Sequence, residues 1–403
     1  MLKRILIVSQ YFYPDTFKIN EIAVELVNAG YKVDVVTGLP DYPSGIIPTA
    51  YKKGKKRNEN YRGVTIHRVS TVARKSGPIF RALNYLSFAI NAARYIKSIK
   101  NNYDNVFVYQ VSPVTMIYPA LKATGRKVVY CMDIWPEAVK AMHINESNPI
   151  YGIIHKISSN LYNSVDKVAV SSYSFIDYLI DENSVPLNRM TYLPQHSDDM
   201  ILADSDNLTK LLKDDQKFHF IFTGNIGNVQ DVETIIRAAS QAKKSNEFVI
   251  DIVGDGSNYS NMQFLAKKLK AKNIVFHGRQ PYSLMAQYYY ESDCCLLTLR
   301  NDNKIGLTIP AKLQAYMSSG RPILAALEGD SRKIINAAQC GKVVHASAIR
   351  ELADEMDNFL NYSKTELADM GKNARNYYLN NFTMKEFITN LIRIFEGEIK
   401  NGN

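Results

Sequence analysis

The sequence is poor in cysteine and tryptophan and has no long apolar segment. It contains one tryptophan and four cysteines, at Cys131, Cys294, Cys295 and Cys340. The cysteines lack the spacing of metal ligands, so we expect reduced, buried thiols in a cytosolic protein, and neither a disulfide scaffold nor a metal site. No window of about 18 apolar residues occurs, and the apolar run at the N-terminus is too short for a signal peptide. We therefore expect a protein that is neither exported nor membrane-spanning.

Acidic residues are almost missing from one part of the chain. Residues 51–100 hold 13 Lys and Arg against one Glu, whereas the rest of the chain is close to neutral and the whole has a net charge of +10. A local excess of positive charge indicates a polyanionic partner. Residues 79–99 combine helical spacing of apolar side chains with Arg81, Arg94 and Lys97, a pattern typical of a helix that rests on anionic lipid.

Two alternatives to a lipid surface stay open for this basic segment. Nucleic acid is the competing polyanion, but the chain has no recognisable nucleic-acid-binding motif, so we expect no nucleic-acid partner. Alternatively, residues 79–99 form a buried packing helix with charged flanks.

Strand and helix patterns alternate along the whole chain. Short apolar runs separated by helical periodicity lie at 3–8, 33–37, 64–69, 106–109, 127–131 and 168–171, and again at 218–222, 248–253, 274–277, 294–299 and 323–326. This alternation predicts an α/β fold with parallel, doubly wound sheets, and 403 residues are enough for two domains of about 200 residues each. A polar segment at 198–217 interrupts the alternation and predicts the boundary between the domains.

The stretch from Leu299 to Pro322 joins a buried strand to a helix start. Pro310 suits the first turn of a helix that we expect over residues 311–319 and that ends at Gly320. The free N–H groups of that turn favour an anion, and Arg300, Lys304 and Lys312 are near it in the sequence, which predicts a site for a diphosphate. The alternative is an ordinary strand-loop-helix unit with solvated lysines.

Glycine-rich loops follow the other strands of the second half. They are Gly224-Asn225-Ile226-Gly227-Asn228, Gly254-Asp255-Gly256-Ser257 and Gly278-Arg279-Gln280-Pro281. Each one alone can simply terminate a strand, but together they indicate a ligand at the carboxyl ends of the strands, because glycine lets backbone N–H groups approach an anion closely.

Two carboxylates follow the strand at 127–131. Asp133, beside the single tryptophan, is the candidate that orients or deprotonates an acceptor hydroxyl, and Glu137 is the second candidate. Alternatively, Asp133 caps the following turn. The histidines, including His67, His143, His155, His196 and His219, have no paired spacing for a metal.

The motifs of this chain resemble those of a known enzyme family. TGNIG, IVGDGS, NIVFHGRQP and KLQAYMSSGRPIL are similar to the donor domain of family 4 glycosyltransferases, which have the two-domain GT-B architecture. QYFYPDTFKINEIA, GLPDYPSG and CMDIWPEAV resemble a bacterial surface-polysaccharide subgroup that includes N-acetyl-L-fucosamine transferases. The resemblance implies an acceptor-side domain at 1–196, a donor domain at 197–383 facing it across a cleft, and a C-terminal helix at about 384–400 that returns to the first domain.

The resemblance also implies substrates, location and site residues. The donor is a nucleotide sugar, with UDP-N-acetyl-L-fucosamine as the leading guess, and the acceptor is a lipid-diphosphate-linked saccharide at the inner face of the cytoplasmic membrane. No cofactor or metal ion is expected. Residues 51–100 would contact the membrane. The expected donor-binding residues are Lys18, Gly224, Asn225, Gly254, Arg279, Gln280, Arg300, Lys304, Thr308, Lys312 and Gln314, and the expected acceptor-binding residues are Pro14, Asn20, Asp41, Tyr42 and Trp135.

The chain departs from the family pattern at the donor site. Where the family has two glutamates, this chain has Leu307 and Ala315. Gln314, one residue before the second position, is either a substitute for that glutamate or a neutral helix residue. The family tends to hold the diphosphate with an Arg and a Lys, here called the cationic clamp, and this chain has the neutral residues Asn225 and Gln230 at those positions. We expect Lys18, Lys312 and the other nearby cations to compensate. Retention and inversion of the anomeric configuration therefore both stay open, and a non-catalytic nucleotide-sugar-binding or scaffold protein is the alternative from another class.

Overall fold

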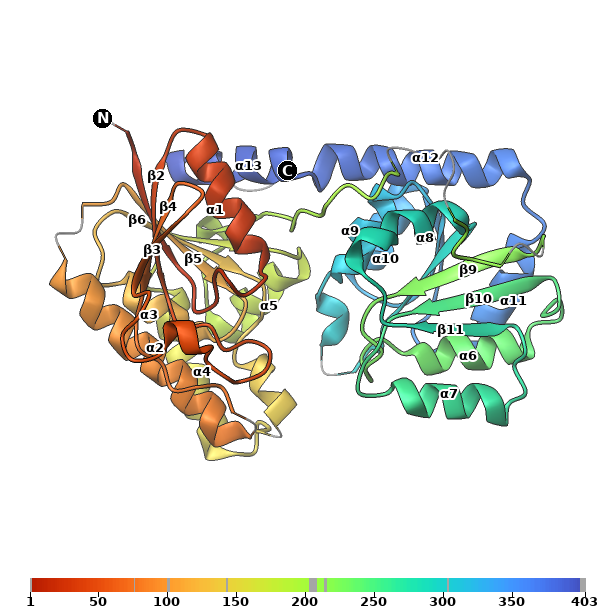
Figure 1. Ribbon diagram of the computed structural model, residues 1–403, viewed down its shortest axis with the longest axis horizontal. Coiled ribbons are helices and arrows are strands. Elements are labelled where there is room, and N and C mark those ends of the chain that lie inside the picture. Colours follow the sequence, from red (N-terminus) through yellow and green to blue (C-terminus); the bar gives the residue numbers. More distant parts are fainter. Residues whose placement is uncertain are drawn as a thin grey trace. The chain divides into compact units, whose positions relative to one another are not determined.

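The computed structural model describes residues 2–75, 77–99, 102–142, 144–202, 209–213, 216–302 and 304–398. His143 and Asn303 lie outside the described residues. The chain forms two compact units, one made of residues 1–194 and 388–403 and the other of residues 195–387. The sequence predicts the division at 196/197 and the return at about 384. Each unit is built on its own sheet and is described by itself (Figure 1).

Unit 1 contains an eight-stranded sheet in the order β3-β4-β2-β1-β5-β6-β7-β8. Its strands are β1 (Arg4–Val8), β2 (Lys32–Thr37), β3 (Asn58–Tyr61), β4 (Val64–Arg68), β5 (Asn105–Gln110), β6 (Arg126–Cys131), β7 (Lys167–Val170) and β8 (Met190–Tyr192). β1 pairs in parallel with both β2 and β5, and only the edge strand β3 runs antiparallel. The order reverses direction beside β1, which is where a doubly wound sheet opens a crevice for ligands.

Helices and short 3-10 turns connect these strands. They are α1 (Lys18–Asn28), η1 (Thr49–Tyr51), α2 (Pro78–Ser98), η2 (Val114–Met116), α3 (Ile117–Ala120), η3 (Glu137–Met142), α4 (Pro149–Tyr162), α5 (Ser174–Asn183) and η4 (Leu187–Arg189). α2 packs against α3, and both α2 and α4 contact η2, so these elements lie together on unit 1 (Figure 1). Sequence periodicity predicts α2 within a residue of its observed ends, but it does not predict α4, α5 or the edge strands β3 and β8.

Unit 2 contains a six-stranded parallel sheet in the order β11-β10-β9-β12-β13-β14. Its strands are β9 (Phe218–Thr223), β10 (Phe248–Val253), β11 (Ile274–Gly278), β12 (Cys294–Thr298), β13 (Ile323–Ala326) and β14 (Gly341–Val344). Its connecting elements are α6 (Val232–Gln241), α7 (Tyr259–Lys268), η5 (Tyr282–Leu284), α8 (Met285–Glu291), η6 (Ile305–Leu307), α9 (Ala311–Ser318), α10 (Asp330–Ala338), α11 (Ile349–Phe359) and α12 (Lys364–Asn381).

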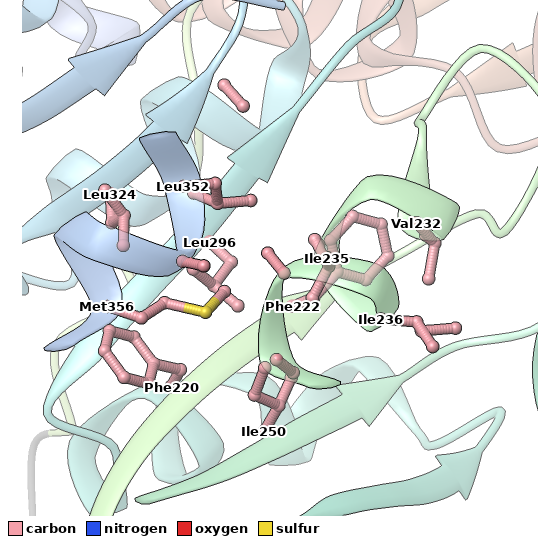
Figure 2. Packing of buried hydrophobic residues seen from close by; sticks show 14 of the residues in the cluster. Phe220, Phe222, Val232, Ile235, Ile236, Ile250, Leu296, Leu324, Leu352 and Met356 are labelled. Atoms are coloured by element: carbon pink, nitrogen blue, oxygen red, sulfur yellow. The ribbon is translucent and has the colours of Figure 1, made fainter. Parts of the chain in front are cut away.

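One face of the unit 2 sheet forms a closely packed apolar core. Phe220 and Phe222 of β9 point toward Ile235 of α6 and Met356 of α11, and all four side chains are buried (Figure 2). On the opposite face, Tyr289 and Tyr316 bind the end of β9, since the Tyr316 hydroxyl accepts the Thr223 N–H at 2.9 Å and the Tyr289 hydroxyl lies 2.8 Å from the Thr223 hydroxyl. The core and these hydrogen bonds fix the point where the loop after β9 begins.

The last helix, α13 (Met384–Glu396), links the two units along the chain. From Ile388 onward it belongs to unit 1. There Phe395 meets Phe107 of β5 edge to face, with ring centroids 5.8 Å apart. All four cysteines are buried and free, as the sequence predicts.

Candidate active site

Three glycine-rich loops of unit 2 form one pocket of about 680 Å³ at the carboxyl ends of β9, β10 and β11. Five of the expected donor-binding residues line it: Gly224, Asn225, Gly254, Arg279 and Gln280. The loops pack on one another so closely that a Cβ at Gly254 would lie 1.9 Å from the carbonyl oxygen of Gly224, and both glycines have positive φ. Only glycine fits this contact, and it brings the backbones of the two loops together at the edge of the pocket, where backbone N–H groups can approach an anion.

Lys312, in the first turn of α9, packs against the Gly224 loop beside this pocket but is not among the residues that line it. Its Cε would lie 2.9 Å from a Cβ at Gly224, and its Nζ lies 3.5 Å from the centroid of the Phe222 ring. Nζ is buried and has no hydrogen-bond partner in the described structure. Burial lowers the pKa of the Lys312 ammonium to about 7. A buried cation without a counter-ion is costly, and a diphosphate at the Gly224 loop would supply the missing charge.

The other expected donor residues lie outside this pocket. Arg300 pairs with Asp231 (3.6 Å) and Glu233 (3.8 Å) in a separate hollow of about 410 Å³, so two carboxylates already neutralise its charge. Lys304 and Thr308 are exposed on the segment before α9, and Pro310 is the N-cap of α9.

Gln314 turns inward on α9. It is 2% exposed, and with its amide nitrogen facing the first turn it donates to the carbonyl oxygens of Pro310 and Ala311, each at 3.1 Å. Gln314 therefore binds its own helix, which agrees with its interpretation as a neutral helix residue.

The positions of the family's cationic clamp form a neutral pair. Asn225 Nδ2 donates to Gln230 Oε1 at 3.1 Å, and the same oxygen accepts the Gly227 N–H at 3.1 Å. This pair holds the loop after β9 in shape but brings no charge, so positive charge near the pocket comes from Arg279, which lines it, and from Lys312, which packs against Gly224.

Two histidines that share one carboxylate in the unit 2 sheet escape the sequence pattern. Asp251 of β10 accepts from His219 of β9 and from His277 of β11, both at 2.7 Å. Although burial alone would raise the pKa of Asp251, these two hydrogen bonds hold it below its ordinary value. Because the three residues are far apart in sequence, no spacing reveals that they join neighbouring strands.

Unit 1 has its own pocket of about 410 Å³, and Asp133, Tyr42 and Trp135 line it. The Asp133 carboxylate accepts no hydrogen bond in the described structure, so it does not cap the following turn. Burial raises the pKa of Asp133 to about 7. Tyr11 Oη and Trp135 Nε1 are buried in the same wall without a hydrogen-bond partner among the described residues. Such orphaned donors favour a polar ligand in the pocket.

The remaining candidates of unit 1 lie beside this pocket and do not line it. Glu137 is buried and forms an ion pair with Lys140 at 2.8 Å. Asn20 is buried and donates to the carbonyl of Asp15 at 2.8 Å, and Pro14 is exposed. Lys18 is the first residue of α1 and is partly buried.

Asp41 is only 3% exposed and accepts the Arg74 N–H at 2.7 Å. Two residues that line the pocket, Arg74 and Arg81, are absent from the site expected from the sequence, because the sequence analysis assigns the charge of residues 51–100 to a membrane-facing surface.

No group of three or more His, Cys, Asp or Glu side chains that could hold a metal ion occurs in the described part of the chain. Two α/β units, one with glycine loops and a buried lysine at the carboxyl edge of its sheet and the other with a buried carboxyl in a pocket, are typical of a nucleotide-binding class of enzyme.

Comparison with known proteins identifies the class of reaction. Residues 204–377 match the family described as "Glycosyl transferases group 1". The chain is 21% identical over 79% of its length to WcaI of Escherichia coli K12, named as a colanic acid biosynthesis glycosyl transferase, and covers 81% of that protein. It is 24% identical to WbjE of Pseudomonas aeruginosa, named as a glycosyltransferase, over 53% of the chain and 54% of that protein.

Solved structures agree on the fold. Sucrose-phosphate synthase from Thermosynechococcus elongatus superposes with a TM-score of 0.75, 14% identity and 99% coverage of both chains. Anabaena HepE in complex with UDP-glucose superposes with a TM-score of 0.67, 13% identity, and coverage of 98% of this chain and 99% of that one. The protein therefore has the two-domain GT-B fold and is a glycosyltransferase, and its similarity to the group 1 family lies in residues 204–377.

Proposed function

We propose that the protein transfers a sugar from a nucleotide diphosphate, bound in the unit 2 pocket, to a hydroxyl of a lipid-diphosphate-linked saccharide bound in the unit 1 pocket. The observation that carries this proposal is the unpartnered, buried Lys312 amine against the Gly224 loop. An ammonium at that point can be satisfied by a donor diphosphate, and it takes the place of the clamp that Asn225 and Gln230 do not provide.

A surface-polysaccharide role is supported by the similarity to WcaI, named for colanic acid biosynthesis. The leading donor is the UDP form of N-acetyl-L-fucosamine, on the motifs CMDIWPEAV and GLPDYPSG, and another UDP, GDP or dTDP sugar is the alternative. UDP as the nucleotide gains support from the UDP complexes of Anabaena HepE.

Asp133 acts on the acceptor in this proposal. A carboxyl with a pKa near 7 is half ionised at neutral pH, which suits a general base for a sugar hydroxyl. The cationic groups at the donor pocket supply the charge that stabilises the leaving diphosphate, so we propose a metal-independent reaction that continues in the presence of EDTA.

A panel of UDP, GDP and dTDP sugars tests the proposal. Purified protein is incubated with each donor and a lipid-linked saccharide, and both transfer and donor hydrolysis are followed. Transfer from one donor is the expected result. If no donor is transferred or hydrolysed, the proposed activity is refuted.

A binding protein without turnover is the second candidate, and it is favoured by Leu307 and Ala315 at the positions of the family's glutamates. Calorimetry separates the two. Binding of a nucleotide sugar without turnover on any acceptor would support the second candidate.

We also propose that unit 1 rests on the cytoplasmic face of an anionic membrane. α2, α3 and α4 contain no acidic residue. Together they expose a row of large apolar side chains, called here the apolar face: Ile79, Phe80, Leu83, Leu86, Ile90, Tyr118, Ile150, Ile153 and Ile157. No helix of the described structure is long and apolar enough to cross a membrane.

A further inference from the structure

Two arginines form a wall of the unit 1 pocket. Arg74 lies on the loop before α2, and Arg81 lies in the first turns of α2, where its N–H donates to the carbonyl of Gly77 at 3.3 Å. Neither guanidinium forms an ion pair with any carboxylate of the described residues. Two guanidinium groups in one pocket, neither in an ion pair within the described residues, are suited to an anion with several oxygens.

Arg74 is held in place by a buried network below the pocket. Asp41 Oδ2 accepts the Arg74 backbone N–H at 2.7 Å and Asn84 Nδ2 at 3.3 Å, and Asn84 Nδ2 also donates to the carbonyl of Val72 at 2.6 Å. The network hydrogen-bonds the Arg74 backbone, and the positive charge of the Arg74 guanidinium also offsets part of the rise in the pKa of Asp41 that burial causes. Its guanidinium remains over the rings of Tyr11 (5.9 Å) and Tyr42 (5.5 Å), which leaves its five N–H groups available to a ligand.

The Asp133 carboxyl in the same pocket does not neutralise these arginines. The Asp133 carboxylate forms no ion pair with either arginine, and burial raises its pKa to about 7. The pocket therefore has a cationic part and a separate part with an uncharged or weakly charged acid. A ligand with an anionic segment joined to a hydroxylated segment fits both.

The surroundings of Arg81 narrow the choice of anion. Ile79, Phe80 and Leu83 flank it on α2 and are all exposed, with 72% of Ile79 accessible. An anion bound at Arg81 would lie beside these apolar side chains, which suit a hydrocarbon chain attached to the anion. The diphosphate of a nucleotide sugar has no such chain, and it has its own candidate site at Lys312 and the Gly224 loop in unit 2.

We propose that Arg74 and Arg81 bind the diphosphate of a lipid-diphosphate-linked acceptor, with its hydrocarbon chain over Ile79, Phe80 and Leu83 and its saccharide toward Asp133. This inference rests on the proposed function, because it assigns the acceptor site of the same transfer reaction. The two arginines select acceptors by the diphosphate, whichever saccharide it carries.

Direct binding tests the inference without any turnover. Farnesyl diphosphate, a soluble prenyl diphosphate, is titrated into the full-length protein by calorimetry. We expect Arg74→Ala and Arg81→Ala each to weaken its binding about tenfold or more, since each removes a charge-assisted hydrogen-bonding group. Arg94→Ala is the matched control, because Arg94 is an exposed arginine of the same helix that does not line the pocket.

Lysine variants and a second ligand separate charge from structure. Arg74→Lys and Arg81→Lys keep the charge without the planar fork, so we expect an intermediate affinity. UDP binding should be unchanged in all these variants, which also shows that they are folded. Equal weakening by Arg94→Ala, or a farnesyl diphosphate affinity that none of the pocket variants alters, would overturn the inference.

Kinetics distinguish a failure of this inference from a failure of the proposed function. With a lipid-diphosphate-linked saccharide, Arg74→Ala and Arg81→Ala should raise the acceptor KM and leave the donor KM unchanged. With the same saccharide on an uncharged alkyl glycoside, both variants should behave like wild type. If the donor KM rises instead, the arginines bind the donor and the inference is refuted. If the wild-type protein is inactive with every donor, the transferase proposal is refuted, and the farnesyl diphosphate titration alone then decides whether the arginines bind a lipid diphosphate.

Discussion

Lys312, the proposed ligand of the donor diphosphate, is expected to destabilise the ligand-free protein, because its amine is buried without a partner in the described structure. Its Nζ is buried over the Phe222 ring without a hydrogen-bond partner in the described structure, and burial lowers its pKa to about 7 from an ordinary value of 10.5. Between those two pH values the unfolded chain binds one more proton than the folded chain at this residue. The contribution of Lys312 to stability therefore becomes more favourable as pH rises from about 7 toward 10.5.

We predict that Lys312→Met stabilises the ligand-free protein and weakens donor binding. Methionine keeps the length and packing of the side chain and removes the unpaired charge, so the unfolding temperature at pH 7 should rise and lose part of its pH dependence. UDP affinity should fall about tenfold or more. Differential scanning calorimetry and UDP titration measure both effects. Lys267→Met, at an exposed position of α7, is the control that should change neither.

The pKa of Lys312 also predicts a pH dependence of wild-type donor binding. A bound diphosphate stabilises the ammonium, so binding at pH 8–9 requires uptake of a proton, and UDP affinity should decrease as pH rises above about 7. Calorimetry in two buffers of different ionisation enthalpy detects the proton. Affinity that is constant from pH 6 to pH 9 would show that Lys312 is not part of the donor site.

Asp133 gives a second prediction for a single residue. As a general base it must be ionised, so kcat should rise with pH and level off above about 7. Asp133→Asn should lower kcat about 10²- to 10⁴-fold and remove this pH dependence, while the donor KM stays the same. Near-normal turnover of the variant would exclude the role. An NMR assignment of the product linkage against that of the donor then decides between inversion and retention.

In unit 2, the loops after β9 and β10 pack backbone against backbone at Gly224 and Gly254, and a side chain at Gly254 would prevent this contact. Gly254 has φ +148 and a Cβ there would lie 1.9 Å from the Gly224 carbonyl oxygen. We predict that Gly254→Ala separates the two loops, lowers the unfolding temperature and abolishes UDP binding, because the glycine loops bring their backbones together at the pocket. Gly54→Ala is the control, since Gly54 has φ +77 but no atom within 4 Å of the added Cβ. Equal effects of the two substitutions would attribute the loss to backbone strain alone.

Regular elements with a strong pattern can be predicted from the sequence. β9, β10, β12 and β13 are buried apolar runs and α13 is strongly periodic, and the predicted ranges match the observed ones within a few residues. α4 and α5 escape prediction because their apolar residues do not all face the core. In α4, Ile150, Ile153 and Ile157 are exposed, so the helix lacks the simple apolar stripe on which the prediction depends.

The site is predictable where it depends on loops after strands and not where it depends on tertiary contacts. The glycine loops can be located because strand ends gather at one edge of a parallel sheet. The pairing of Arg300 with Asp231 and the insertion of Arg74 and Arg81 into a pocket depend on side-chain directions that sequence spacing does not specify. The charge of residues 51–100 can be counted from the sequence. Which of these basic residues lie on the surface and which line a pocket can be seen only in the folded structure.

For the molecule as a whole, the charge distribution leads to a prediction about location. The basic segment at 51–100 and the acid-free helices α2, α3 and α4 belong to unit 1, and the apolar face lies on those helices. Long-range attraction by the basic residues and burial of apolar side chains would act together on an anionic membrane. Salt weakens the electrostatic attraction and does not screen the burial of apolar side chains, so the two contributions can be separated by varying the salt concentration.

We predict that the full-length protein binds vesicles containing phosphatidylglycerol and binds neutral phosphatidylcholine vesicles much more weakly, as measured by co-flotation. Binding should weaken as salt rises to about 1 M, where the Debye length falls to about 3 Å. Ile79→Glu combined with Ile153→Glu should abolish binding, because each places a carboxylate on the apolar face. Phe264→Glu is the matched control, since Phe264 is 70% exposed on α7 of unit 2 and lies on no part of that face. Binding that is insensitive to both salt and anionic lipid would refute the electrostatic contribution, and retention of binding by the double variant would move the contact away from α2 and α4.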